Sequence, residues 1–267
     1  MLDMVLAEGK ILAHVKNGVG TIVFNQPEKR NAMSVIMWDG LAEALDRFAA
    51  DDAVRCVVLE GAGGKAFVSG ADISQFEKTR SDAEAQREYG RRTGIGRQKL
   101  ADFQKPVIAK IQGFCMGGGL GIAMTCDIRI AGVGSEFGIP AARLGIAYGY
   151  ETVKALVALV GPAHAHYILM TGGRISGEEA ERMGLINKLH PAEELDAVVE
   201  KLTATMARNA PLSLKANKRA VLSVLQDRAD RDLAQIDADT AACFDSEDYR
   251  EGRTAFMAKR QPVFTGR

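Results

Sequence analysis

The chain has 267 residues, and 47% of them are hydrophobic, so it is long and apolar enough to bury a large core. Its 34 basic residues balance 34 acidic ones, which argues against attraction to nucleic acid or to an anionic membrane through bulk charge. Neither a bilayer-spanning apolar run nor a signal peptide is expected, so we expect a cytoplasmic globular protein. The four cysteines and four histidines have no metal-ligand spacing, so we expect buried thiols and no metal site.

The first half of the chain predicts alternating strands and helices. Residues 11–24 alternate in polarity as two strands, and Asn17-Gly18 between them favours a type I′ hairpin turn. Ser34 is placed to cap a helix along the apolar side of residues 35–48. Apolar runs and helical spacing predict five further elements: a strand at 54–59, a weak helix or mobile lid at 81–104, a strand at 107–111, a short helix at 120–124 and a strand at 128–131.

Two glycine-rich loops in this half have backbones that a ligand could approach. Gly117-Gly118-Gly119 lies between a strand and a short helix, where the first N–H groups have no intrahelical partner and lie at the positive end of the helix dipole. Such amides can hold a developing negative charge, as an oxyanion hole does. The segment Ser69-Gly70-Ala71-Asp72 could supply a second N–H to the same anion. The alternative is that the glycine triplet only permits tight packing of the helix on the strand.

The second half predicts a more helical structure. Gly161-Pro162 separates two predicted helices, at residues 153–160 and 163–170. Ser176 and Glu179 have the spacing of a capping box for a short helix, and a strand is predicted at residues 185–189. From residue 192 onward the pattern is helical, with breaks near Pro211, near residues 227–230 and near Asp245. We therefore divide the chain into a core, residues 1–200, and a helical C-terminal region, residues 201–267.

Taken together, the motifs resemble the enoyl-CoA hydratase/isomerase (crotonase) superfamily over nearly the whole chain. The matching motifs are Asn31-Ala32, Ser69-Gly70-Ala71-Asp72-Ile73, Gly117-Gly118-Gly119, Cys126-Asp127, Phe137-Gly138, Leu144-Gly145, Thr171-Gly172, Ala180 with Gly184-Leu185-Ile186, and Phe256 with Lys259-Arg260. The resemblance implies an α/β fold in which a spiral of ββα units is followed by a helical C-terminal region that builds homotrimers, often paired into hexamers. It also implies an acyl-CoA thioester as the substrate, with coenzyme A entering as part of that substrate and no tightly bound cofactor.

The resemblance also assigns roles to particular residues. The N–H groups of Ala71 and Gly118 would polarise the thioester carbonyl and stabilise the enolate that forms. The residues expected to bind the coenzyme are Arg30, Ala32, Ser69, Ala71, Asp72, Ile73, Phe256 and Lys259. For Ser69 and Asp72, the alternative is that they hold the oxyanion loop in shape, as these residue types commonly do in turns.

The chain departs from the family at two glutamate positions. Hydratases of the family carry one glutamate shortly after the glycine triplet and a second directly after the proline of the Phe-Gly-x-Pro turn. This chain has Gly121 and Ala141 at those places, and neither can accept a proton. Because a positioned general acid or base contributes about 10² to 10⁴ in rate, their absence argues against efficient hydration by the usual route.

Two titratable residues remain as candidates for proton transfer. Tyr148 lies where the decarboxylases of the family carry a tyrosine, although the histidine that accompanies it there is replaced by Ala71. Glu151 lies near the place where some isomerases carry their one acid. The alternatives are that Tyr148 forms a pocket wall and that Glu151 stabilises a helix N-terminus. Arg143 could pair with a substrate carboxylate or form a surface salt bridge.

Three hypotheses follow. The first is a CoA-thioester lyase or isomerase that acts through an enolate, by decarboxylation, isomerisation or a related step with Tyr148 or Glu151 as the proton donor. The second is a nominal enoyl-CoA hydratase of low activity. The third is a catalytically weak subunit that only binds CoA thioesters.

Overall fold

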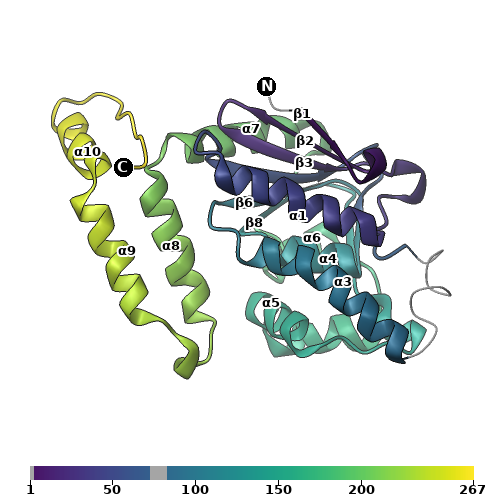
Figure 1. The fold of residues 1–267 in the computed structure, drawn as a ribbon. Helices are drawn as coiled ribbons and strands as arrows, with labels where there is room; N and C mark the ends of the chain where they lie inside the picture. The colour runs from purple at the N-terminus through teal and green to yellow at the C-terminus, as the bar shows by residue number, and fades with distance from the viewer. Residues whose placement is uncertain (1–2, 73–82) are drawn as a thin grey trace.

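A computed structural model describes residues 3–72 and 83–267, which form an α/β core and a helical arm (Figure 1). The strands are β1 (Asp3–Leu6), β2 (Ile11–Lys16), β3 (Val19–Phe24), β4 (Cys56–Gly61), β5 (Ala66–Val68), β6 (Val107–Ile111), β7 (Phe114–Met116), β8 (Ile128–Gly132), β9 (Glu136–Gly138), β10 (Ile175–Ser176) and β11 (Lys188–His190). The α-helices are α1 (Val35–Ala50), α3 (Ala83–Ala101), α4 (Gly118–Thr125), α5 (Tyr150–Thr171), α6 (Gly177–Arg182), α7 (Leu195–Arg208), α8 (Pro211–Val224), α9 (Leu233–Asp245) and α10 (Glu247–Met257).

The larger sheet runs in the order β1-β2-β3-β4-β6-β8-β11. Its first three strands pair antiparallel, and the others pair parallel from β3 onward. The predicted hairpin is confirmed, because Asn17 and Gly18 join β2 to β3 with φ values of 52° and 77°, the positive sign that a type I′ turn requires. The sequence did not predict the edge strand β1.

Strand β4 shows why this sheet is buried on both faces. Val57 and Leu59 belong to the main core with Trp38 of α1, whereas Cys56 and Val58 point to the other face, where they join a second cluster that includes Leu195 of α7. Figure 1 shows α1 and α3 lying side by side over one face of the sheet. The domain boundary expected at residue 201 falls inside α7.

A smaller sheet, in the order β10-β9-β7-β5, supports the glycine triplet. The predicted strand β6 and helix α4 are both present, a further strand β7 that the sequence did not predict lies between them, and α4 packs tightly against β5. A Cβ atom added to Gly119 would lie 2.1 Å from the Val68 carbonyl oxygen, so this glycine is required for packing. The packing alternative for the triplet is therefore correct for Gly119.

Helix α5 bends where the sequence predicted a break, because Gly161 has a φ of 72° and Pro162 follows it. By length and composition, α5 is apolar enough to cross a membrane, with a mean hydropathy of 1.3. The prediction that no segment is long enough was therefore wrong. In this fold α5 carries Leu156, Val160 and Ile168 into the main core.

The C-terminal arm consists of α8, α9 and α10, which extend away from the sheets in Figure 1. The breaks predicted near Pro211, residues 227–230 and Asp245 are confirmed. The arm exposes large apolar side chains, among them Phe256, which is 82% exposed. A cavity of about 490 Å³ lies between the three helices, lined mainly by apolar side chains that include Phe244, Tyr249 and Phe264.

Two capping predictions had different outcomes. At α6, the Ser176 hydroxyl accepts from the Glu179 N–H and the Glu179 carboxylate accepts from the Ser176 N–H, both at 3.2 Å, which confirms the capping box. Ser34 lies at the N-cap of α1, but its hydroxyl makes no capping bond and, within the described part of the chain, has no hydrogen-bond partner. The predicted strand at 185–189 begins only at Lys188, because a turn follows α6.

Candidate active site

The backbones of the two glycine-rich loops lie close to each other. A Cβ atom placed on Gly118 would lie 4.0 Å from the Ala71 amide nitrogen, and one placed on Gly117 would lie 3.9 Å from the Gly70 Cα. Gly70 and Gly117 have φ values of 123° and 53°, conformations that favour glycine. The fold therefore brings together the two amides that the sequence predicted as oxyanion donors.

The Ala71 loop is held by backbone pairing. Ala71 forms an isolated parallel bridge with Met33, in which the Met33 N–H donates to the Gly70 carbonyl at 2.8 Å and the Asp72 N–H donates to the Met33 carbonyl at 3.0 Å. These bonds use the groups on either side of Ala71. Its own N–H has no acceptor among the described residues, so no described group competes with a ligand for it.

Ser69 and Asp72 bond to the preceding loop. The Ser69 N–H donates to the Arg30 carbonyl at 3.1 Å, and its hydroxyl donates to the Lys29 carbonyl at 3.4 Å. The buried Asp72 carboxylate accepts from the Lys29 ammonium at 2.9 Å. These contacts fit the alternative in which both residues hold the loop in shape.

Gly118 is the first residue of α4, so its N–H has no intrahelical acceptor. The preceding Gly117 N–H donates to the Gly138 carbonyl at 2.8 Å, which ties the turn to strand β9. Among the described residues, no group accepts a hydrogen bond from the Gly118 N–H. The helix dipole adds positive potential at this position, so an anion between Gly118 and Ala71 would be stabilised.

Tyr148 reaches the same place from the loop before α5. Its hydroxyl would lie 3.5 Å from a Cβ atom on Gly117, the residue before Gly118, and its half-buried ring packs against the main core. Glu151 lies in the first turn of α5 and is exposed. The structure thus places Tyr148, rather than Glu151, in contact with the glycine turn.

The two positions that lack glutamates differ in their surroundings. A Cβ atom on Gly121 would meet no described atom within 4 Å, so a side chain has room there. Ala141 is 8% exposed and lies in a short 3₁₀ turn, Pro140–Leu144.

Within the described residues, no group of three or more His, Cys, Asp or Glu side chains could hold a metal ion.

A cavity of about 260 Å³ adjoins the two loops and contains three arginines. Its lining residues are Arg30, Ser69, Phe114, Met116, Pro140, Arg143, Gly172 and Arg174. The Arg30 and Arg174 guanidinium groups lie 5.0 and 5.1 Å from the Phe114 ring centroid, within cation–π distance. Arg174 pairs with Glu136 at 3.0 Å, whereas Arg30 and Arg143 have no carboxylate partner among the described residues, so the cavity favours an anion.

Several predicted coenzyme-binding residues lie elsewhere. Ala32 is buried in the turn after the first loop, where its N–H donates to the Lys29 carbonyl. Ile73 lies outside the described residues. Phe256 lies in the last turn of α10 and Lys259 just after this helix, and both are exposed. Figure 1 shows α10 in the arm, away from the sheets. A single chain does not bring these two together with Ala71 and Gly118.

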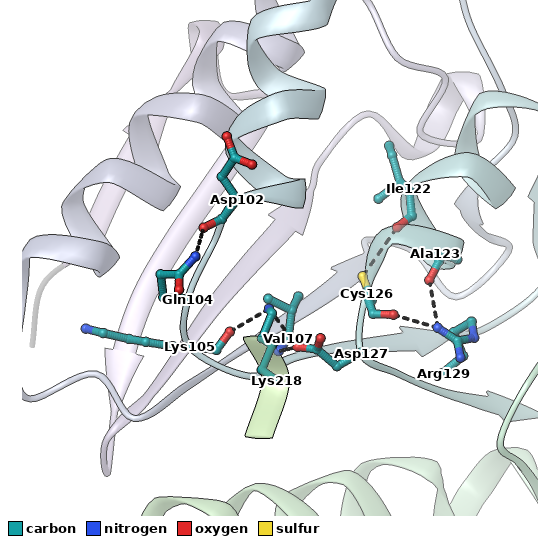
Figure 2. Close-up of polar contacts among 10 residues, drawn as sticks. All are labelled: Asp102, Gln104, Lys105, Val107, Ile122, Ala123, Cys126, Asp127, Arg129 and Lys218. Atoms are coloured by element: carbon teal, nitrogen blue, oxygen red, sulfur yellow. Dashed lines mark hydrogen bonds and ion pairs between the residues drawn. The ribbon is translucent and has the colours of Figure 1, made fainter. Parts of the chain in front are cut away.

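The carboxyl end of α4 contains a buried polar network (Figure 2). The Arg129 side chain, 5% exposed, donates from Nη1 to the Cys126 carbonyl at 2.6 Å and from Nε to the Leu185 carbonyl at 3.0 Å. Burial lowers the pKa of Arg129 and raises the pKa of the Cys126 thiol to about 12. Arg129 therefore caps the last carbonyls of the helix whose first residue is Gly118.

Sequence reasoning missed two residues around the site and the role of a third. Arg174 and Phe114 belong to no motif, so nothing in the sequence indicated that they would share a cavity with Arg30. Asn31 was noted only as part of a motif. It is fully buried, and its amide donates to the Ala62 and Ala66 carbonyls while accepting from the Gln26 N–H, which fixes the loop that carries Arg30.

Comparison with known proteins gives this arrangement a family. Residues 14–267 match the family model described as enoyl-CoA hydratase/isomerase. A crotonyl-CoA hydratase from Syntrophomonas wolfei is 36% identical, with 97% of this chain and 99% of that protein covered. A short-chain-enoyl-CoA hydratase from Clostridium acetobutylicum is 34% identical, with 94% and 95% covered.

Solved structures agree with the sequence relatives. The crystal structure of an enoyl-CoA hydratase/carnithine racemase from Magnetospirillum magneticum superimposes with a TM-score of 0.92 at 35% identity, covering 97% of this chain and 96% of that one. The predicted fold class, a crotonase-like α/β core with a helical C-terminal region, is therefore confirmed. The chain belongs to the enoyl-CoA hydratase/isomerase family, whose members process acyl-CoA thioesters.

Proposed function

We propose that this protein converts an acyl-CoA thioester through an enolate held by the Ala71 and Gly118 amides, with Tyr148 as the proton donor. The observation that carries this proposal is the position of the Tyr148 hydroxyl, 3.5 Å from a Cβ placed on Gly117, the residue before Gly118. A neutral phenol can donate a hydrogen bond or a proton to the forming carbanion or to a leaving carboxylate. In a decarboxylation the C–C bond to the carboxylate breaks, CO2 leaves, its bonding electrons form the enolate, and Tyr148 protonates the carbanion. An isomerisation would also need a base, such as Glu151, to remove a proton before the enolate forms.

A second candidate is hydration of an enoyl-CoA, which the names of the most similar relatives favour. Those names describe the relatives, and in this chain Gly121 and Ala141 stand at the positions where hydratases of the family carry their glutamates. Hydration would need another group to activate water. If Glu151 did so, it would have to turn from its exposed place in the first turn of α5 toward the amides.

A panel of thioesters separates the candidates. Purified protein is incubated with 2-enoyl-, 3-enoyl- and malonyl-type CoA thioesters, and products are identified by mass spectrometry. Tyr148→Phe should lower the rate about 10²-fold or more if the phenol transfers the proton. Tyr150→Phe, an exposed tyrosine two residues away, is the matched control. Loss of activity in Glu151→Gln with full activity in Tyr148→Phe would contradict the assignment and favour Glu151.

The oxyanion donors can be tested on the backbone itself. Gly118→Pro removes the N–H at the first helical position, where proline is tolerated, and should lower turnover about 10²- to 10³-fold. Gly118→Ala keeps the N–H and adds only a methyl group, so it separates loss of the donor from steric blockage. If no thioester is turned over although several bind, the protein is a binding subunit and the enzyme proposal fails.

We also propose that coenzyme A enters as part of the substrate and that the arginine cavity receives its charged end. Arg30, which was expected to bind the coenzyme, and Arg143 lack carboxylate partners among the described residues. Charge-assisted bonds from guanidinium groups suit phosphate. Arg143→Gln should raise KM for every CoA thioester with little change in kcat, while an effect confined to one acyl group would indicate an acyl contact instead.

The exposed arm supports assembly into a homotrimer or hexamer. Phe256 lies on α10 and Lys259 follows it, and Figure 1 shows this helix in the arm, away from the sheets, so both residues would reach a coenzyme only in another copy. Mixing Gly118→Pro subunits with Lys259→Ala subunits tests this idea. If the tail serves another copy, some sites of the mixed oligomer combine both defects and others contain neither. Activity regained on mixing supports the exchange, whereas mass measurements that give a monomer would end it.

A further inference from the structure

One lysine of the arm lies against the segment that carries the oxyanion glycines. Lys218 on α8 is 9% exposed, and its ammonium donates to the Asp127 carboxylate at 2.9 Å and to the Lys105 carbonyl at 3.0 Å (Figure 2). The ammonium also lies 6.0 Å from the Phe103 ring centroid. Such a buried ammonium requires its anionic partner, because an unpaired charge there would be poorly solvated.

Asp127 closes a loop in the chain. Its N–H donates to the Val107 carbonyl at 2.9 Å, and its carboxylate accepts from the Val107 N–H at 2.7 Å. The segment between these two residues contains β6, β7, the glycine triplet and α4. Both ends of the segment that carries Gly118 are therefore joined at one point, and the Lys218 ammonium bonds to the same carboxylate oxygen.

Helix α4 links this point to the site. It has only eight residues, begins at Gly118 and ends one residue before Cys126, whose neighbour is Asp127. A hydrogen-bonded helix of this length is stiff, so a shift at its carboxyl end moves the amide at its amino end. Displacing a catalytic donor by about 1 Å can cost about 10²-fold in rate.

We propose that Lys218 is a positioning residue that fixes α4, and with it the Gly118 amide, by joining the arm to Asp127. The docking of α8 and the geometry of the oxyanion donor are thus coupled through one ion pair. The exposed neighbour Lys215, on the same helix, makes no such contact within the described residues and serves as the matched control. The effect on catalysis rests on the proposed function, but the effect on α4 does not.

Hydrogen–deuterium exchange of the full-length protein tests the coupling without any substrate. Lys218→Met should speed exchange several-fold in peptides from residues 113–127 and leave the hairpin at residues 11–24 unchanged, while Lys215→Met changes neither. Unchanged exchange in residues 113–127 would show that Lys218 only anchors the arm, and would overturn the proposal. If Lys218→Met does not fold, Asp127→Asn removes the charge but keeps an acceptor for Val107, and is judged by the same peptides.

Turnover gives the second readout. Lys218→Met should lower kcat about tenfold to a hundredfold with KM changed by less than about twofold, because the donor rather than the binding surface is displaced. Lys218→Arg, which keeps the charge, should recover most of kcat. Normal kcat in a folded Lys218→Met would contradict the proposal. If the native enzyme turns over no thioester, the proposed function fails, while the exchange result still decides whether Lys218 holds α4.

Discussion

In the core, the loops around Ala71 and Gly118 present backbone amides, whereas in the arm, helices α9 and α10 present large side chains. A Cβ on Gly119 would meet a backbone carbonyl at 2.1 Å, while the Phe256 side chain is 82% exposed. The core site is therefore specified by the absence of side chains. The arm is specified by apolar surface that a single chain leaves uncovered.

The core and the arm therefore place different constraints on which substitutions they tolerate. Close backbone packing leaves no room to adjust, so small substitutions in the core should have large effects on stability. Exposed apolar side chains contribute little to the stability of one chain, but clusters of them mark surfaces for association. Substitutions in the two regions should therefore differ in size and in the property they change.

The largest effect is expected at Gly119. Gly119→Ala forces a methyl group against the Val68 carbonyl and should lower the free energy of unfolding by about 3 kcal/mol, measured by urea denaturation. The methyl group of Gly121→Ala, in the same helix, would meet no described atom within 4 Å, so this substitution should raise the free energy of unfolding by about 0.5 to 1 kcal/mol. Equal effects at both positions would contradict the packing argument.

A smaller loss is expected at the other end of α4. Arg129→Met leaves the buried Cys126 and Leu185 carbonyls without their donor and should cost about 2 kcal/mol in the same assay. Arg182→Met, on the exposed surface of α6, is the control and should change stability little. If Arg129→Met lowers the free energy of unfolding no more than Arg182→Met does, water replaces the guanidinium and the prediction is wrong.

Thiol labelling compares the regions by reactivity. Burial raises the pKa of Cys56 and Cys126 to about 12 and raises that of Cys115 well above its usual value, so these core thiols should stay protonated and unreactive in the native protein. Cys243 of α9 is only half-buried and should react first. Counting labelled thiols before and after unfolding tests this order, and rapid native labelling of Cys126 would show that the core opens readily.

The smallest effect concerns an exposed pair in the arm. Hydrogen bonds from Arg260 and from the Val263 backbone lower the pKa of Glu251 to about 2. Because the folded-state pKa lies below the usual value of about 4.3, the pair stabilises the C-terminal segment at neutral pH and is lost as pH falls toward 2. The difference in melting temperature between wild type and Glu251→Gln should therefore shrink below about pH 4. A constant difference down to pH 3 would exclude this titration.

Local chemistry accounts for the features that the sequence predicted well. The turn at Asn17-Gly18, the capping box of Ser176 and the bend at Gly161-Pro162 each depend on a few adjacent residues. The predicted cap at Ser34 was wrong, although its residue type and position were suitable. The hydroxyl is buried by tertiary packing, and it makes no bond to the first turn of α1.

The sequence by itself determined the hairpin, most of the helices, the family resemblance and the prediction of two amide donors, because glycines at a strand-to-helix turn restrict what the backbone can do. Only the tertiary structure decided which side chains join them. It brought the Tyr148 hydroxyl to the glycine turn, placed Arg30 and Arg174 against the same Phe114 ring, and set Lys218 against Asp127. These partners lie far apart in sequence, and their contacts depend on how sheets and helices pack, which no local pattern records.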